Sequence, residues 1–161
     1  MTAQTLFAVG PYELAEDRYY DPETHLWVAP TAARAKGDRS AGGARCGFDP
    51  LGSETAGDVV AVSFVPAGSR VARGAAFGSL EAAKFVGPLL APVSGTVVAH
   101  NDEVLANPAL LNRDPLRHWL VEIDLADPGG ELPLLLHGRG TVEDWFANEL
   151  RRFHKQGMIA E

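Results

Sequence analysis

Glycine and proline interrupt this chain so often that most segments between them are long enough only for short strands. The 161 residues include 17 glycines and 11 prolines. Between these turn-forming residues lie valine-rich or alternating runs, which predict strands. The strands that we expect cover residues 25–29, 58–64, 75–81, 85–90, 95–100 and 119–125. Gly87 and Pro88 make one of them a poor strand that suits a sheet edge. The pattern favours a mainly β fold.

Helical signals are fewer and are strongest near the C-terminus. Short helical turns are expected at residues 50–56, 102–105 and 108–111. The longest predicted helix covers residues 141–155, with Thr141 as its N-cap and Gly157 as its C-cap. Its apolar stripe consists of Phe146, Leu150 and Phe153. Such a stripe usually packs on the body of the protein, although docking to a partner is the alternative for this extension of about residues 141–161.

The segment 30–47 is polar, basic and rich in glycine, and it is expected to form a long loop. Cys46 lies in it as the only cysteine, so no internal disulfide is possible, and we expect a buried, inert thiol. The five histidines show no close spacing typical of a metal site, so no metal is predicted. Asn107, Asn112 and Asp114 are flanked by prolines and predict turns.

The charge and hydropathy of the chain exclude several classes of partner. The formal net charge is −7, whereas nucleic-acid binders present a basic surface. No apolar run is long enough to span a membrane, and the first twenty residues lack the pattern of a secretory signal. We therefore expect a cytoplasmic protein that binds neither nucleic acid nor membrane.

One lysine occupies an unusual place in this pattern. The chain has three lysines, and Lys84 lies between two predicted strands, at the tip of a hairpin. An exposed amine that points away from a sheet suits the attachment of a long, swinging cofactor arm. Ala82 and Ala83 leave room for a modifying enzyme, and Glu81 offers a carboxylate that would orient it. The alternative is an ordinary surface lysine in a turn.

Several ordered segments around Lys84 resemble the H protein of the glycine cleavage system, a lipoyl carrier. The matching segments are Tyr20-Asp-Pro-Glu-Thr-His-Leu-Trp-Val28, Gly57-Asp-Val-Val60, Phe77-Gly-Ser-Leu-Glu-Ala-Ala-Lys84, Ala91-Pro-Val-Ser-Gly95 and Asn107-Pro-Ala-Leu-Leu-Asn-Arg-Asp-Pro115. They cover roughly residues 12–145. Any one segment is weak, but five in the same order are specific.

The resemblance implies a lipoyl/biotinyl-carrier β-sandwich (a barrel-sandwich hybrid) with short helices and a C-terminal helix, as one domain over residues 1–161 with a core at about 12–140. It implies lipoate on Lys84, with Glu81, Gly95 and more weakly His25 near the cofactor. The chain would carry an aminomethyl group without catalysing a reaction itself. The implied partners are glycine decarboxylase, aminomethyltransferase, dihydrolipoyl dehydrogenase, and a lipoate ligase or lipoyl transferase.

Departures from the family pattern leave other functions open. Ala82, Phe85 and Leu26 replace the usual Ser, Ala and Glu, and the segment 30–45 is longer than its family counterpart. One alternative is a lipoate-binding protein of bacterial sulfur oxidation, working with a heterodisulfide-reductase-like complex. A biotin carrier is disfavoured because no methionine flanks Lys84, and an unmodified interaction protein is disfavoured because Lys84, Glu81 and Gly95 are all present.

Overall fold

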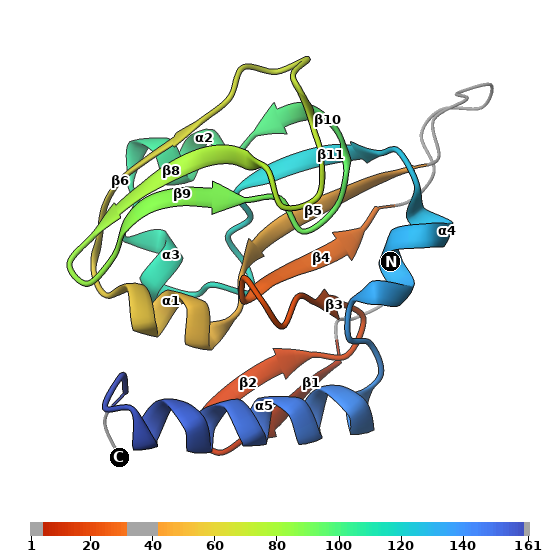
Figure 1. Cartoon of the computed structure of the whole chain (residues 1–161). Coiled ribbons are helices and arrows are strands. Elements are labelled where there is room, and N and C mark those ends of the chain that lie inside the picture. The colour runs from red at the N-terminus through yellow and green to blue at the C-terminus, as the bar shows by residue number, and fades with distance from the viewer. Residues whose placement is uncertain (1–4, 32–41, 160–161) are drawn as a thin grey trace.

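Two antiparallel sheets face each other in the body of the protein (Figure 1). The computed structural model describes residues 5–31 and 42–159. The larger sheet has the strand order β3 (Tyr19–Tyr20), β4 (Leu26–Pro30), β5 (Gly43–Phe48), β11 (Val121–Leu125), β10 (Gly95–His100) and β7 (Arg70–Val71). The smaller sheet has the order β6 (Val59–Phe64), β8 (Ala76–Ala82) and β9 (Val86–Leu90). The mainly β prediction is confirmed, and β9 lies at an edge as expected.

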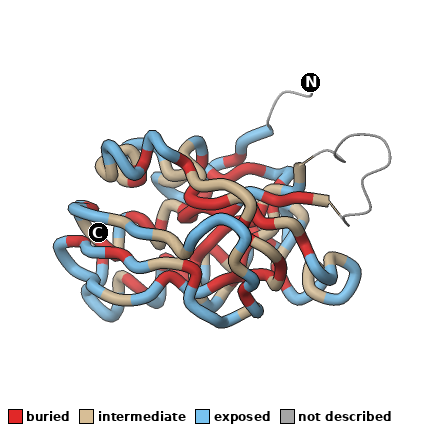
Figure 2. Tube along the Cα trace, turned by 90° about the horizontal axis from the view of Figure 1, so that it is seen from above, coloured by how far each residue is buried: buried red, intermediate tan, exposed pale blue. Residues whose placement is uncertain are grey.

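The main hydrophobic core fills the space between these sheets. Phe77 and Leu80 of β8 meet Val97, Val28 and Ile123 of the larger sheet, and all five side chains are buried. Each such side chain contributes about 1.5–3 kcal/mol of transfer free energy. Figure 2 shows the buried stretches running through the middle of the molecule, with exposed stretches on its outer turns. The facing sheets thus supply a rigid support for the turns at their ends.

The strand β5 corrects one prediction from the sequence. Residues 43–47 were expected to belong to a loop, but Gly43–Phe48 is paired between β4 and β11 inside the larger sheet. Glycine is needed there for packing, because a Cβ on Gly47 would lie 2.4 Å from the Trp27 indole. Cys46 is buried in this strand, and burial raises its pKa to about 12. Residues 32–41 of the expected loop lie outside the described residues.

Four short helical segments connect the strands. They are α1 (Pro50–Ala56), α2 (Asp102–Ala106), α3 (Leu110–Arg113) and α4 (Pro128–Glu131), the last followed by the 3-10 helix η1 (Leu132–Leu134). The first three occur near the predicted positions, whereas α4 and η1 were not predicted. Asp49 caps α1 by accepting a hydrogen bond from the Gly52 amide at 2.9 Å.

A second layer lies beneath the sheets and has its own apolar core (Figure 1). It consists of the hairpin β1 (Leu6–Val9) and β2 (Tyr12–Ala15), which was not predicted, together with the long helix α5 (Arg139–Lys155). The predicted apolar stripe of α5 is buried in this core, so its packing on the body is confirmed. Within the described residues, no helix is long and apolar enough to cross a membrane.

The ends of α5 differ slightly from the prediction. The helix begins at Arg139 with Gly138 as its N-cap, so Thr141 lies inside the first turn. Gly138 has a φ of +96°, a conformation that glycine adopts without strain. At the other end Gln156 is the C-cap, and Gly157 follows it with a φ of +71°.

The contact between Gly47 and Trp27 leads to a stability prediction. Gly47→Ala places a methyl group against the buried indole, and such overpacking costs about 2 kcal/mol of unfolding free energy. Urea unfolding of the wild type and the variant measures this loss, which should appear as a lower midpoint for Gly47→Ala. Gly129→Ala is the control, because nothing lies within 4 Å of a Cβ built there. Equal losses of stability in the two variants would contradict this account of Gly47.

Candidate functional site

Lys84 belongs to the turn between β8 and β9. This turn lies at the left edge of the molecule in Figure 1. The side chain of Lys84 is exposed, as predicted. The backbone beneath it is anchored, because the Lys84 amide donates to the Ala56 carbonyl and the Ala83 amide to the Asp58 carbonyl, both at 2.9 Å. The Ala82 amide also donates to the Phe85 carbonyl at 2.8 Å and closes the turn. Hydrogen bonds therefore hold the backbone of the turn in place, while the side chain of Lys84 extends into solvent.

Gly57 lies directly under the stem of Lys84. Its φ is +77°, which glycine adopts without strain. A Cβ on Gly57 would lie 3.2 Å from Lys84 Cγ and 3.3 Å from Ala83 Cβ. The absence of a side chain at this position lets the segment after α1 lie close against the hairpin.

Lys84 borders two hollows of different chemistry. The first, which we name the apolar cleft, has a volume of about 370 Å³. Its lining consists of Glu23, Thr24, His25, Leu26, Phe48, Gly52, Thr55, Ala56, Leu80, Lys84, Phe85, Pro88, Leu89, Leu90 and Met158. Most of these side chains are apolar, and they come from both sheets and from the segment after α5. The cleft offers an uncharged group a place out of water.

The second hollow, which we name the acidic cleft, is wider, at about 810 Å³. Four carboxylates line it, from Glu13, Glu54, Asp58 and Asp114. The remaining lining residues are Pro11, Tyr12, Pro50, Ser53, Gly57, Ala83, Lys84, Asn112, Arg113, Pro115 and Leu116. The Tyr12 hydroxyl donates a hydrogen bond to the Glu54 carboxylate and ties the β1–β2 hairpin to α1. This surplus of negative charge favours a cationic group.

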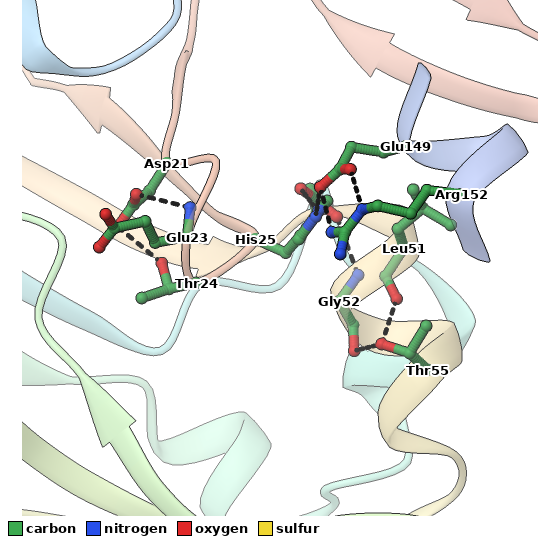
Figure 3. A network of polar contacts seen from close by, with 10 residues as sticks. Asp21, Glu23, Thr24, His25, Leu51, Gly52, Thr55, Glu149 and Arg152 are labelled. Carbon is green, nitrogen blue, oxygen red and sulfur yellow. Dashed lines mark hydrogen bonds and ion pairs between the residues drawn. The ribbon is translucent and has the colours of Figure 1, made fainter. Parts of the chain in front are cut away.

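His25 connects the apolar cleft to the C-terminal helix (Figure 3). Its ring is buried, with Nδ1 at 2.7 Å from Asp49 Oδ2 and Nε2 at 2.8 Å from Glu149 Oε1. A carboxylate only accepts hydrogen bonds, so both ring nitrogens donate only when the imidazole is protonated. Burial lowers the pKa of His25, but the charges and hydrogen bonds of Asp49 and Glu149 raise it overall. The contacts of both ring nitrogens with carboxylate oxygens therefore favour the protonated imidazole.

Arg152 completes this network on the solvent side. Its Nε lies 2.7 Å from Glu149 Oε2, and its Nη2 lies 2.8 Å from Glu149 Oε1. The hydrogen bond from Arg152, followed by the contact with His25, lowers the pKa of Glu149. The His25 ring also stacks on Trp145 of α5 at 5.1 Å. The structure therefore gives His25 a fixed place between α1 and α5.

The predicted site residues do not all meet at Lys84. His25 lines the same cleft as Lys84, whereas Glu81 is exposed on β8 and borders neither hollow. Gly95 is buried in β10, where a Cβ would lie 2.1 Å from the Asp124 carbonyl oxygen, so its glycine serves close strand packing. Among the described residues, no group of three or more His, Cys, Asp or Glu side chains is placed to hold a metal ion.

Comparison with known proteins decides the family. The model of the glycine cleavage H-protein family matches residues 18–143, most of the chain. The chain belongs to this family. The resemblance that the sequence motifs indicated is therefore confirmed, and with it the lipoyl-carrier type of β-sandwich.

Individual H proteins agree with this assignment. The probable glycine cleavage system H protein 3 of Sulfurisphaera tokodaii is 35% identical over 71% of this chain and 78% of its own length. The H protein of Micrococcus luteus is 41% identical over 64% of this chain and 76% of its own. The crystal structure of the Mycobacterium marinum H protein aligns with a TM-score of 0.65 at 29% identity, over 84% of this chain and 98% of that one. These relatives give no support to the sulfur-oxidation alternative.

The segment matched by the H-protein family contains Lys84 but not every wall of the two clefts. The β1–β2 hairpin, which brings Glu13 to the acidic cleft, precedes residue 18. Met158 of the apolar cleft follows residue 143, as do Glu149 and Arg152 of the His25 network. Sequence reasoning missed Glu13, Asp49 and Glu149. Asp49 before Pro50 is a recognisable N-cap signal, but no local pattern marks Glu149 as a partner of His25.

The charge arrangement around His25 predicts a pH dependence. The folded-state pKa lies above the ordinary value of about 6.5. The contribution of His25 to stability is therefore complete below pH 6.5 and is lost as the pH rises through the folded-state pKa. His25→Asn, which tolerates the φ of +58°, should cost about 3 kcal/mol near pH 6 and clearly less at alkaline pH.

Urea unfolding across this pH range measures the difference between the wild type and His25→Asn. His100→Asn is the control, because its ring hydrogen-bonds the backbone carbonyl of Val65 at 2.7 Å in place of a carboxylate. A cost of His25→Asn that stays constant with pH, or grows as pH rises, would show that the ring is not held as a cation.

Proposed function

We propose that this H protein carries a lipoyl group in amide linkage to Lys84 and uses it to shuttle an aminomethyl group between partner enzymes. The observation that carries the proposal is the exposed Lys84 amine on an anchored turn, inside the segment that the family model matches. The residues present fit the group. The neighbouring Ala83 is small and exposed, and the adjoining hollows leave room for an arm on either side.

The apolar cleft suits the unloaded arm. Leu80 and Leu89 are buried along it, and Phe85 and Leu90 are partly exposed at its border, so a dithiolane ring placed there would be removed from water. When bound, the group would supply a disulfide that opens to a thiol as its other sulfur takes up the aminomethyl group, and the dithiol left after delivery would be oxidised back to the disulfide by the dehydrogenase partner. The protein's own side chains only shelter and orient the arm, so we propose a carrier without catalysis of its own.

The acidic cleft supports the choice of aminomethyl as the cargo. An aminomethyl group ends in a primary amine, which is largely protonated near neutral pH. Glu13, Glu54 and Asp58 present carboxylates in the acidic cleft, which Lys84 borders. A cationic cargo is favoured in such surroundings, whereas an anionic persulfide would be repelled.

This function requires the enzymes that load, unload and restore the arm. We propose glycine decarboxylase, aminomethyltransferase and dihydrolipoyl dehydrogenase as these partners, and a lipoate ligase or lipoyl transferase for attachment. We also propose a cytoplasmic setting, since the one thiol, Cys46, is buried and forms no disulfide.

Attachment of the cofactor is tested by intact-mass spectrometry. Protein made in a host supplied with lipoate should gain the mass of one lipoyl group, and Lys84→Arg should abolish that gain because a guanidinium does not form the amide. Lys155→Arg, at the exposed end of α5, is the matched control and should keep it. An increment that persists in Lys84→Arg would overturn the assignment of the site.

The cargo is tested with glycine decarboxylase. Verified lipoylated protein should support exchange of bicarbonate into the glycine carboxyl group, and Lys84→Arg should reduce the exchange to background. Because lipoylation is confirmed first by mass, a lipoylated protein that supports no exchange would overturn the aminomethyl cargo while leaving the lipoyl carrier assignment intact.

A further inference from the structure

The side chain of Asn112 makes two hydrogen bonds to a distant part of the chain. Asn112 lies on α3 and lines the acidic cleft together with Lys84. Its Nδ2 donates to the Gly57 carbonyl at 2.8 Å, and its Oδ1 accepts from the Val59 amide at 2.9 Å. The sequence predicted that Asn112 serves its own turn, but both partners are more than fifty residues away.

The segment that Asn112 holds is the one that supports the lysine. The carbonyls of Ala56 and Asp58 accept hydrogen bonds from the amides of Lys84 and Ala83, and the carbonyl of Gly57, between them, accepts from Asn112. The backbone groups of this segment thus alternate between the hairpin on one side and Asn112 on the other.

We propose that Asn112 is a positioning residue for Lys84, which fixes the turn at Gly57 so that the lysine is presented to the lipoate-attaching enzyme. This inference rests on the proposed function. Without Asn112, the Gly57 carbonyl and the Val59 amide lose their partner, and a glycine in the left-handed region has little steric resistance to rotation. Rotation of the peptides around Gly57 turns the carbonyls of Ala56 and Asp58 away from the hairpin.

The carboxamide is well suited to this task because its two ends differ. The donor end faces a carbonyl and the acceptor end faces an amide, so only one orientation satisfies both. In the variant Asn112→Asp, the side chain would still accept from the Val59 amide but would present an ionised oxygen to the Gly57 carbonyl. Asn112→Asp therefore keeps the hydrogen bond from the Val59 amide and replaces the one to the Gly57 carbonyl with repulsion between two oxygens. The volume of the side chain stays almost unchanged.

Asn101 provides a matched control. It also uses both ends of its carboxamide, with Nδ2 donating to the Trp119 carbonyl at 2.9 Å and Oδ1 accepting from the Glu103 amide at 3.2 Å. Asn101 caps α2 and borders neither cleft beside Lys84. Asn101→Ala and Asn112→Ala therefore remove the same kinds of bond, but only the second removes them beneath the lysine.

The experiment measures lipoylation of each full-length, unmodified variant by a lipoate ligase with lipoate and ATP, well below both melting temperatures. Asn112→Ala and Asn112→Asp should lower kcat/KM of the ligase for the carrier about tenfold, because a misplaced reacting group loses rate steeply. Asn101→Ala should be modified at the wild-type rate although its melting temperature also falls. If Asn112→Ala does not fold, Asn112→Asp carries the comparison.

A second measurement reports on the hairpin itself. Amide hydrogen exchange should accelerate about tenfold at Ala83 and Lys84 in both Asn112 variants and stay unchanged there in Asn101→Ala. Wild-type lipoylation and exchange in the Asn112 variants, or equal effects in Asn101→Ala, would overturn the inference. A wild-type chain that is not lipoylated would instead overturn the proposed function, and the exchange data would still decide the role of Asn112.

Discussion

Burial of one face of β8 is the constraint on which the rest of the site depends. Phe77, Leu80 and Ala82 all point into the core between the sheets. An irregularity in the pairing between Ala76 and Gly78 brings Phe77 onto the same face as Leu80, three residues away. A slip of one residue along β6 or β9 would expose this whole set, so the register is fixed by apolar burial. The same register decides that Lys84, two residues beyond Ala82, is the residue at the exposed tip.

The second layer adds surfaces to this fixed hairpin without taking part in the main core. It is joined to the body by buried side chains such as Trp27 and Leu51 and by the His25 network, which connects α1 and α5. Pro11, Tyr12 and Glu13 of the β1–β2 hairpin border the acidic cleft, and Met158, which follows α5, borders the apolar cleft. Lys84 and most of the lining of both clefts thus lie inside the H-protein segment, and the parts of the chain outside it supply the rest of that lining.

Local signals allowed much of the fold to be predicted. Strand alternation, turn residues and the stripe of α5 identified most elements and the tip position of Lys84. The strand β5 was missed because Gly43 and Gly47 look like loop residues, whereas Gly47 is a glycine in order to admit the Trp27 indole. Asn112, Asp49 and Glu149 act through side-chain contacts across 24 to 124 residues of sequence, and such contacts leave no periodic trace. These three residues can be identified only from the folded structure, in which their partners lie next to them.

The four carboxylates of the acidic cleft have an electrostatic consequence for recognition. Formation of the proposed amide on Lys84 would remove a positive charge that borders the cleft, and the net charge of the chain would change from −7 to −8. The unmodified and modified forms then differ most in the field around the hairpin, within a Debye length of about 8 Å at physiological ionic strength. A partner with a basic surface would associate faster with the mature carrier than with its precursor, even before it touched the cofactor.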